Sequence, residues 1–176
     1  MSIPAQDIPE IAPPKGLKIR YTVPQDAEWL KKWLLDPSVR GAFPMLGETE
    51  ADDAVRRWIS FSRMRSSLTV EMNDHPVGIS TLYVQNYKRL LHQTEFGIIV
   101  DHAYRGQGVG SYLLSSIMKL AKRHFHIELL HLQVYQGNSA IQLYKKFGFK
   151  EFGCQTHWIK DTDGTYVGRI FMERFL

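Results

Sequence analysis

Three glycines, Gly106, Gly108 and Gly110, lie within five residues of the segment RGQGVGSYLL. The apolar run TEFGIIV at 94–100 precedes them and an amphipathic pattern follows, so they mark the passage from a strand to a helix. A helix N-terminus presents unpaired backbone N–H groups and roughly half a positive charge. Glycines let such a backbone approach an anion closely, so the segment predicts a phosphate-binding loop. A tight turn that binds nothing is the alternative.

The spacing of the glycines excludes two common phosphate loops. The nucleoside-triphosphate loop requires Lys and then Ser or Thr after its last glycine, where this chain has Ser111 and Tyr112. The dinucleotide fingerprint G-x-G-x-x-G requires glycine at position 111. It also requires an acidic residue near the end of the next strand, where Tyr135 and Gln136 stand.

A third pattern fits, because Arg105–Gly110 resembles the R/Q-x-x-G-x-G/A loop of the GNAT superfamily of acyl-CoA-dependent N-acetyltransferases. A later segment, VYQGNSAIQLYKKFGFKEFG, resembles the part of that superfamily in which an asparagine opens a helix, a tyrosine follows and Gly-Phe ends it. The matching residues are Asn138, Ala140, Tyr144, Gly148 and Phe149. The resemblance covers residues 67–153, and extends more loosely back to residue 17.

The resemblance implies a layered α/β fold, with a mixed and mostly antiparallel sheet, a splayed central parallel pair of strands and about four flanking helices. It also implies acetyl-CoA as co-substrate, with its pyrophosphate on the amides of 105–110 and its pantetheine arm paired like an added strand with Ile99 and Val100. The expected cofactor-binding residues are Ile98, Ile99, Val100, Arg105, Gly106, Gln107, Gly108, Val109, Gly110, Ser111, Asn138 and Tyr144.

Acyl transfer from a thioester to an amine needs a base for the amine, stabilisation of the carbonyl oxygen, and a proton for the departing thiolate. The resemblance makes Tyr144 the candidate acid; a core aromatic residue is the alternative. It makes Glu95 the candidate base, and strand alternation places Glu95 and Ile99 on one face of the sheet. A strand-end carboxylate with a structural partner is the alternative for Glu95.

Other chemistry-bearing residues have smaller roles in this interpretation. His92 and Asp101 are poorer candidates for the base, and a backbone N–H near Ile98 or Ile99 is the expected oxyanion donor. Because a thioester is already activated, Cys154 is not needed as a nucleophile. The seven histidines are scattered and form no metal-ligand pattern, so we expect no metal.

Length, composition and charge limit the domain organisation, the cellular compartment and the partners that we expect. At 176 residues we expect one domain at 17–176, preceded by an extended arm at 1–16 that contains four prolines. A single cysteine suits a reducing compartment, and no secretory signal or membrane-spanning run is evident, so a cytoplasmic protein is expected. The net charge of +4 is too small to indicate nucleic-acid binding. Monomer and homodimer stay open.

The hydrophobic periods predict eleven elements that must position these residues. We expect strands at 17–23, 67–72, 77–84, 94–100, 128–135, 149–159 and 166–175, and helices at 27–36, 49–65, 108–124 and 138–147. The strand–helix–strand unit between 94 and 135 implies two parallel neighbours. On helix 108–124, Ser115 and Ser116 are expected on the face away from the core.

The acceptor is left open among a protein N-terminus, a polyamine and another small amine. The front half of the chain resembles the branch that holds ribosomal-protein N-terminal and spermidine acetyltransferases, and the segments 41–53, 84–93 and 161–166 would select the acceptor. Two further functions remain as alternatives: a non-catalytic acyl-CoA-binding module, and an acetyltransferase that acts on aminoacyl-tRNA.

Overall fold

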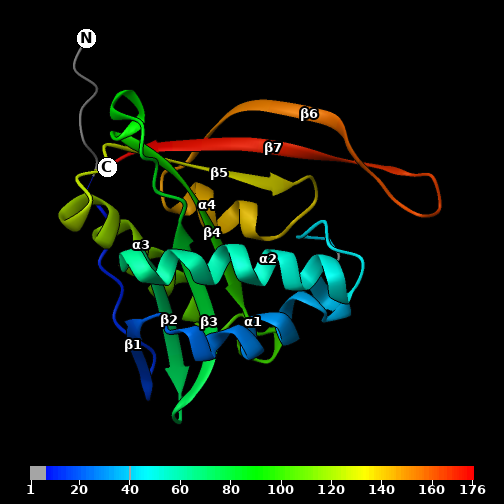
Figure 1. Cartoon of the computed structure of the whole chain (residues 1–176). Coiled ribbons are helices and arrows are strands. Elements are labelled where there is room, and N and C mark those ends of the chain that lie inside the picture. Colours follow the sequence, from blue (N-terminus) through cyan, green and yellow to red (C-terminus); the bar gives the residue numbers. More distant parts are fainter. Residues whose placement is uncertain (1–6, 40) are drawn as a thin grey trace.

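The computed structural model describes residues 7–39 and 41–176 and contains a seven-stranded mixed sheet of order β1-β2-β3-β4-β5-β7-β6 (Figure 1). Its strands are β1 (Leu17–Tyr21), β2 (Ser67–Met72), β3 (His75–Leu82), β4 (Gln93–Val100), β5 (Leu129–Tyr135), β6 (Lys150–Lys160) and β7 (Tyr166–Phe175). β4 and β5 pair in parallel, and every other neighbouring pair is antiparallel. The predicted sheet, with one parallel pair, is confirmed.

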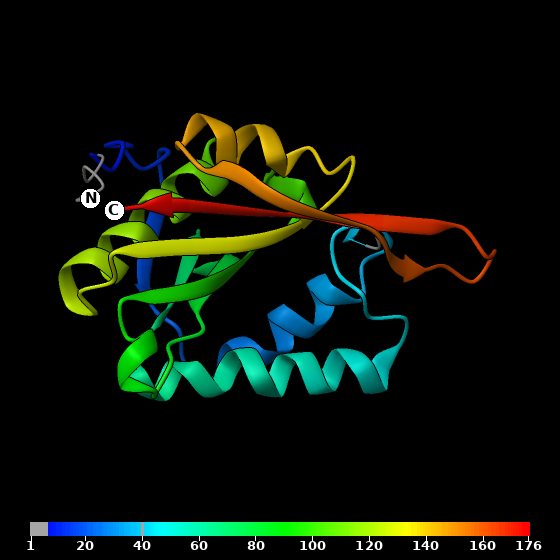
Figure 2. The same ribbon diagram turned by 90° about the horizontal axis from the view of Figure 1, so that it is seen from above.

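In the part of the chain that the structure describes, four α-helices cover the two faces of the sheet. They are α1 (Ala27–Leu34), α2 (Glu48–Ser60), α3 (Val109–His124) and α4 (Ala140–Lys146). Figure 2 shows α3 and α4 on one side of the sheet and α1 and α2 on the other. Each side has its own apolar core, one around α3 that includes Phe96 and Tyr144, and one around α1 and α2 that includes Ile79 and Ile99. β6 and β7 extend beyond these layers as a hairpin (Figures 1 and 2).

The four helices differ at their ends from the expected ranges; the one expected at 27–36 ends at Leu34, and the one expected at 108–124 begins at Val109. The helix expected at 49–65 ends at Ser60 and continues as a 3₁₀ turn at Phe61–Met64. The helix expected at 138–147 begins at Ala140, so Ser139 and not Asn138 is at the N-cap position. The Asn138 Oδ1 accepts a hydrogen bond from the Ala140 N–H at 2.9 Å, one residue before the cap. Gly148 follows that helix with φ +80°, the left-handed conformation typical of a helix end.

The parallel pair β4–β5 is short. It includes only the register pairs Gln93–Leu129, Thr94–Leu130 and Glu95–His131, although both strands continue beyond them. Past this point β4 stays paired with β3 as far as Val100, and β5 stays paired with β7 as far as Tyr135. The two strands therefore diverge, and the predicted splay between them is present.

Residues 7–16 run without helix or strand along α3, and residues 1–6 of the expected arm lie outside the described residues. The Ser115 hydroxyl donates to the Pro9 carbonyl at 2.6 Å, and Lys119 pairs with Glu10. Ser115 is consequently buried, and the expectation that it faces away from the core is wrong, because the helical period takes no account of a covering segment.

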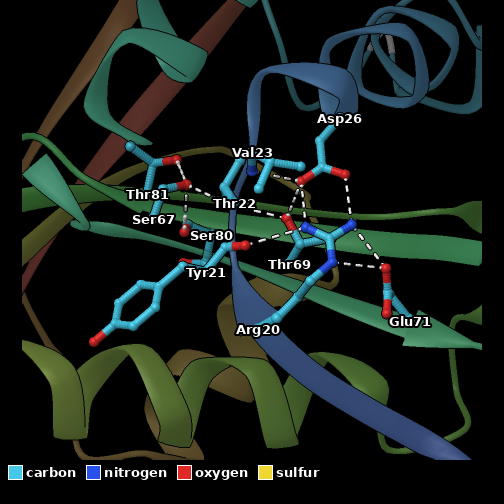
Figure 3. Close-up of polar contacts among 10 residues, drawn as sticks. All are labelled: Arg20, Tyr21, Thr22, Val23, Asp26, Ser67, Thr69, Glu71, Ser80 and Thr81. Atoms are coloured by element: carbon cyan, nitrogen blue, oxygen red, sulfur yellow. Dashed lines mark hydrogen bonds and ion pairs between the residues drawn. The ribbon is translucent and has the colours of Figure 1, made fainter. Parts of the chain in front are cut away.

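A buried polar network ties β1 to the neighbouring strands beneath α1 (Figure 3). The Asp26 carboxylate accepts hydrogen bonds from both terminal nitrogens of Arg20, at 2.7 and 2.8 Å, from the Val23 N–H and from the Thr69 hydroxyl. Hydroxyl contacts continue from Thr69 to Thr22, Ser67 and Thr81. Burial acts to raise the pKa of Asp26, but these donors outweigh it and the pKa is lowered.

We expect Asp26→Asn to lower the free energy of unfolding by about 2–3 kcal/mol at pH 7, because its amide cannot balance Arg20, whose partial exposure moderates the loss. A carboxylate whose pKa is lower in the folded than in the unfolded protein stabilises the fold at pH values above its unfolded pKa. This stabilisation is lost as the pH falls. The difference between parent and variant should therefore narrow below about pH 4. Urea unfolding across pH measures this.

The matched control is Asp74→Asn, which removes a carboxylate from the exposed pair with Lys18 and should leave stability nearly unchanged. Equal losses in the two variants would contradict the role given to Asp26.

Candidate active site

A cleft of about 690 Å³ occupies the opening between the diverging ends of β4 and β5. It extends from the loop before α3 to the segment between α1 and α2, so both sides of the sheet contribute to it. Its lining includes Phe43, Phe96, Gly97, Ile98, Ile99, Val100, Arg105, Gly106, Gly108, Gly110, Ser111, Leu132, Gln133, Val134, Asn138 and Tyr144.

One wall of the cleft is the open edge of β4. The Tyr83 N–H donates to the Glu95 carbonyl and the Asp101 N–H donates to the Val77 carbonyl, both at 2.9 Å, so these residues direct their backbone polar groups toward β3. Alternate residues of an antiparallel strand share that direction. Ile98 and Val100 therefore direct theirs into the opening.

Ile99 and Val100 were both expected to offer their backbone to the pantetheine arm, but the register of β4 separates them. Ile99 is paired with Ile79 and its backbone faces β3, whereas the Ile98 and Val100 N–H groups face the cleft. The Val100 carbonyl accepts a hydrogen bond from Arg105 Nε at 3.0 Å, which fixes the start of the glycine loop against the strand.

The glycine loop forms the end of the cleft at the N-terminus of α3. Gly106 and Gly108 have φ of +72° and +85°, a conformation that favours glycine. Within the described residues, none of the N–H groups of 106–111 donates to an acceptor of the chain, and the first helical bond runs from the Tyr112 N–H to the Gly108 carbonyl. Six consecutive donors at a helix N-terminus are suited to bind an anion.

Tyr144 contributes its phenol from α4 on the opposite wall. Its ring is buried and packs edge-on against Phe96 and Phe149, with centroids 6.2 and 6.0 Å away. Burial raises the pKa of the Tyr144 hydroxyl, so the phenol stays protonated across the physiological range and can donate a hydrogen bond into the cleft.

Glu95 lies at the apex of the opening, in the last position of β4 that pairs with β5. Its Oε2 accepts a hydrogen bond of 3.2 Å from Nε2 of Gln133, which lines the cleft. Burial raises the pKa of Glu95, while the Gln133 hydrogen bond and the charge of Arg169 oppose that rise. A half-buried carboxylate with a raised pKa is suited to accept a proton near neutral pH.

The side of the cleft under α2 is closed by aromatic rings. Phe43 packs edge-on against Trp58, with centroids 6.0 Å apart, and Trp58 lies against Gly97. A Cβ at position 97 would come within 2.6 Å of the Trp58 ring and still closer to the Tyr83 hydroxyl. Glycine is therefore required here for close packing rather than for backbone freedom.

Most of the residues predicted to bind the cofactor surround this one cleft. Two do not line it: Val109 is buried in the α3 core, and Gln107 donates from its side chain to the Ala103 carbonyl. Glu95 borders the cleft through Gln133, which sequence reasoning did not select. The sequence did contain a sign of this role, because Gln133 is a polar residue in the alternating strand LLHLQVY and shares a face with His131.

The described residues contain no group of three or more His, Cys, Asp or Glu side chains that could hold a metal ion. None of their helices is long and apolar enough to cross a membrane.

Comparison with known proteins agrees with this architecture. Residues 30–149 match the family model described as the acetyltransferase (GNAT) family, so the chain belongs to the GNAT acetyltransferase family. It is similar to the L-amino acid N-acetyltransferase AaaT of Escherichia coli, with 32% identity over 99 residues, 56% of this chain and 60% of AaaT. It is also 38% identical over 87 residues to an N-alpha-acetyltransferase of Sulfurisphaera tokodaii, covering 47% of this chain and 52% of that protein.

The chain thus spans between half and three fifths of the length of these curated relatives. Among solved structures, an acetyltransferase from Salmonella typhimurium with its cofactor acetyl-CoA shares the fold, with a TM-score of 0.76 and 18% identity. That match covers 92% of this chain and 95% of the other.

Proposed function

We propose that this protein transfers an acetyl group from acetyl-CoA to a primary amine, and that the acceptor is the α-amino group of an amino acid or of a peptide. The observation that carries the proposal is the single cleft that joins an open strand edge, an anion-binding helix N-terminus and a buried phenol. Family membership supports the same activity.

The cleft suits coenzyme A in both charge and shape. The N–H groups of 106–111 match the oxygens of a pyrophosphate, and the Ser111 hydroxyl adjoins them. The amide-bearing pantetheine arm can pair with the exposed backbone of Ile98 and Val100, as an added strand would. Asn138 and the α4 side of the cleft complete the wall beside that arm.

Bound acetyl-CoA supplies an activated thioester carbonyl, so the protein needs no covalent nucleophile and Cys154 needs no part in the reaction. Glu95 accepts a proton from the acceptor amine, directly or through a water molecule, as the nitrogen forms its new bond to the carbonyl carbon and the carbon–sulfur bond breaks. Tyr144 donates a proton to the departing thiolate and regains one from solvent. A strand-edge N–H, of Ile98 or Val100, stabilises the carbonyl oxygen.

The choice of acceptor rests on the two curated relatives, whose names specify an L-amino acid and an N-alpha amine. Polyamines, a non-catalytic acyl-CoA-binding role and aminoacyl-tRNA are the competing functions. A cleft that Tyr144 lines and that Glu95 borders through Gln133 favours catalysis over binding alone, and a net charge of +4 gives little support for tRNA.

The primary test is thiol release from acetyl-CoA with L-amino acids, peptides of varied N-termini, spermidine and charged tRNA. We expect release with α-amines, and expect Tyr144→Phe to lower kcat by about ten- to a hundredfold because the thiolate loses its proton donor. The dissociation constant of acetyl-CoA should change less than about twofold. Tight acetyl-CoA binding without release for any acceptor would contradict the proposal, and an unchanged kcat would remove Tyr144 from it.

Gly110→Ala tests whether glycine is needed at this position for the stability of the fold or for the binding of acetyl-CoA. Gly110 lies in the first turn of α3, and an added Cβ would have its nearest neighbour at 3.7 Å, so the free protein should gain about 0.5–1 kcal/mol of stability. The same methyl group enters the cleft and should weaken acetyl-CoA binding by about tenfold. Urea unfolding and calorimetric titration measure the two effects.

Gly106→Ala is the comparison variant for this experiment. A Cβ there meets nothing within 4 Å, yet φ of +72° should cost the free protein about 1–2 kcal/mol. If Gly110→Ala bound acetyl-CoA as tightly as the parent, the loop would not hold the pyrophosphate.

For Glu95, the raised pKa predicts that kcat/KM falls with decreasing pH, from a higher pH than an ordinary glutamate would give. Glu95→Gln should remove this acid limb and lower the plateau by about a hundredfold. The pH profile of kcat/KM from pH 5 to 9 measures both effects. A variant profile that overlays that of the parent would exclude Glu95 as the base.

A further inference from the structure

Three strands contribute to a chain of polar contacts that ends at Glu95. Gln133 on β5 donates from Nε2 to Glu95 Oε2 on β4 at 3.2 Å, and its Oε1 accepts a hydrogen bond from Arg169 Nη1 on β7. Gln133 lies two residues beyond the last β4–β5 pair, so its side chain crosses the opening. Arg169 is thereby linked to the Glu95 carboxylate through the side-chain amide of Gln133.

The direction of the Gln133 amide follows from its partners. A guanidinium carries only donors, so Arg169 requires the amide oxygen on its side. The amide NH₂ group must then face Glu95, and because that group only donates, it favours the ionised carboxylate over the protonated acid. Arg169 thus determines which form of Glu95 the amide stabilises.

Arg169 is itself held in place by β6 and β7. Its Nε donates to Gln155 Oε1 at 3.1 Å. Its guanidinium lies 3.3 Å from the centroid of the Trp158 ring and 4.7 Å from that of Phe171. A planar cation packed against two aromatic rings and bonded along its edge has little freedom to turn away from Gln133.

Other titratable groups face Glu95 from the packed elements. Tyr83, which follows β3, has a pKa raised by burial and by the Glu95 charge, so it stays neutral, and Arg57 of α2 acts on that tyrosine. His131 is the register partner of Glu95 on β5, and burial lowers its pKa, which keeps it uncharged at neutral pH. Arg169 is the cation whose charge acts on Glu95.

We propose that Arg169 is a positioning residue that acts through Gln133 to hold Glu95 as an oriented carboxylate at the apex of the cleft. The contact chain stands on its own, whereas its catalytic purpose rests on the proposed acetyl transfer with Glu95 as base. Through this chain the projecting β6–β7 hairpin is connected to the proton acceptor.

The first test needs neither acceptor nor acetyl-CoA. The full-length protein, labelled with ¹³C at glutamate carboxyl groups, is titrated by NMR, and Glu95→Gln assigns the Glu95 signal. We expect the titration midpoint of Glu95 to move to higher pH in Arg169→Met and in Gln133→Met. Lys160→Met, which removes another cation of the hairpin that lies over Tyr166, should leave the midpoint in place.

A double variant shows whether Arg169 acts on Glu95 through the Gln133 amide or directly through the long-range effect of its charge. If Arg169 acts through Gln133, adding Arg169→Met to Gln133→Met should move the midpoint little further. Full additivity would overturn the relay. Arg169→Lys replaces Arg169→Met if the methionine variant does not fold. Lysine keeps the charge but lacks the planar guanidinium, so the Glu95 titration midpoint should lie between those of the parent and Gln133→Met.

The second test measures kcat/KM against pH. Each half unit by which the midpoint rises lowers the rate on the acid limb by about threefold, while KM for acetyl-CoA should stay within twofold. Equal Glu95 titrations in parent and Arg169→Met would overturn the proposal whatever the activity. A shifted titration in a protein that transfers no acetyl group would retain the contact chain and overturn its catalytic purpose, along with the proposed function.

Discussion

The loss of pairing between β4 and β5 after Glu95 and His131 is the constraint on which the site depends. In a continuous parallel pair the backbone groups of Ile98 and Val100 would be satisfied by β5, and no cleft would exist. Because the strands diverge, the same groups face an opening that a ligand with amides of its own can fill. The site thus lies where a sheet hydrogen-bond ladder is left incomplete.

The divergence is maintained by what each strand binds on its other edge and by what fills the space between them. β4 follows β3 as far as Val100, and β5 follows β7 as far as Tyr135. On the α3 side, the rings of Phe96 on β4, Tyr144 on α4 and Phe149 in the turn before β6 form a buried cluster. Tyr144 belongs to that cluster and also lines the cleft, so one residue combines core packing with the proton-donor role that we propose for it.

The sequence predicted the strands, the helices and the glycine loop, because local periods and glycine spacing are properties of short segments. It did not predict which backbone groups of β4 face the opening, since register depends on the pairing with β3. It also missed the burial of Ser115 beneath residues 7–16 and the contact between Gln133 and Arg169. Each of these requires two segments distant in sequence to be placed side by side, which no single-segment pattern contains.

A carboxylate that serves as a base must be held in place and yet be reachable, and the apex of a splayed pair meets both needs. On its paired side, Glu95 belongs to a regular sheet whose backbone fixes the direction of its side chain. On its open side, the residues of β4 and β5 that follow the last pair line the cleft. Burial would by itself favour the neutral acid, so an ionised Glu95 needs a donor that is itself fixed. Gln133 can be such a donor because Arg169 holds its oxygen, and by this route a residue on β7 would act on the proton transfer that we propose for Glu95 on β4.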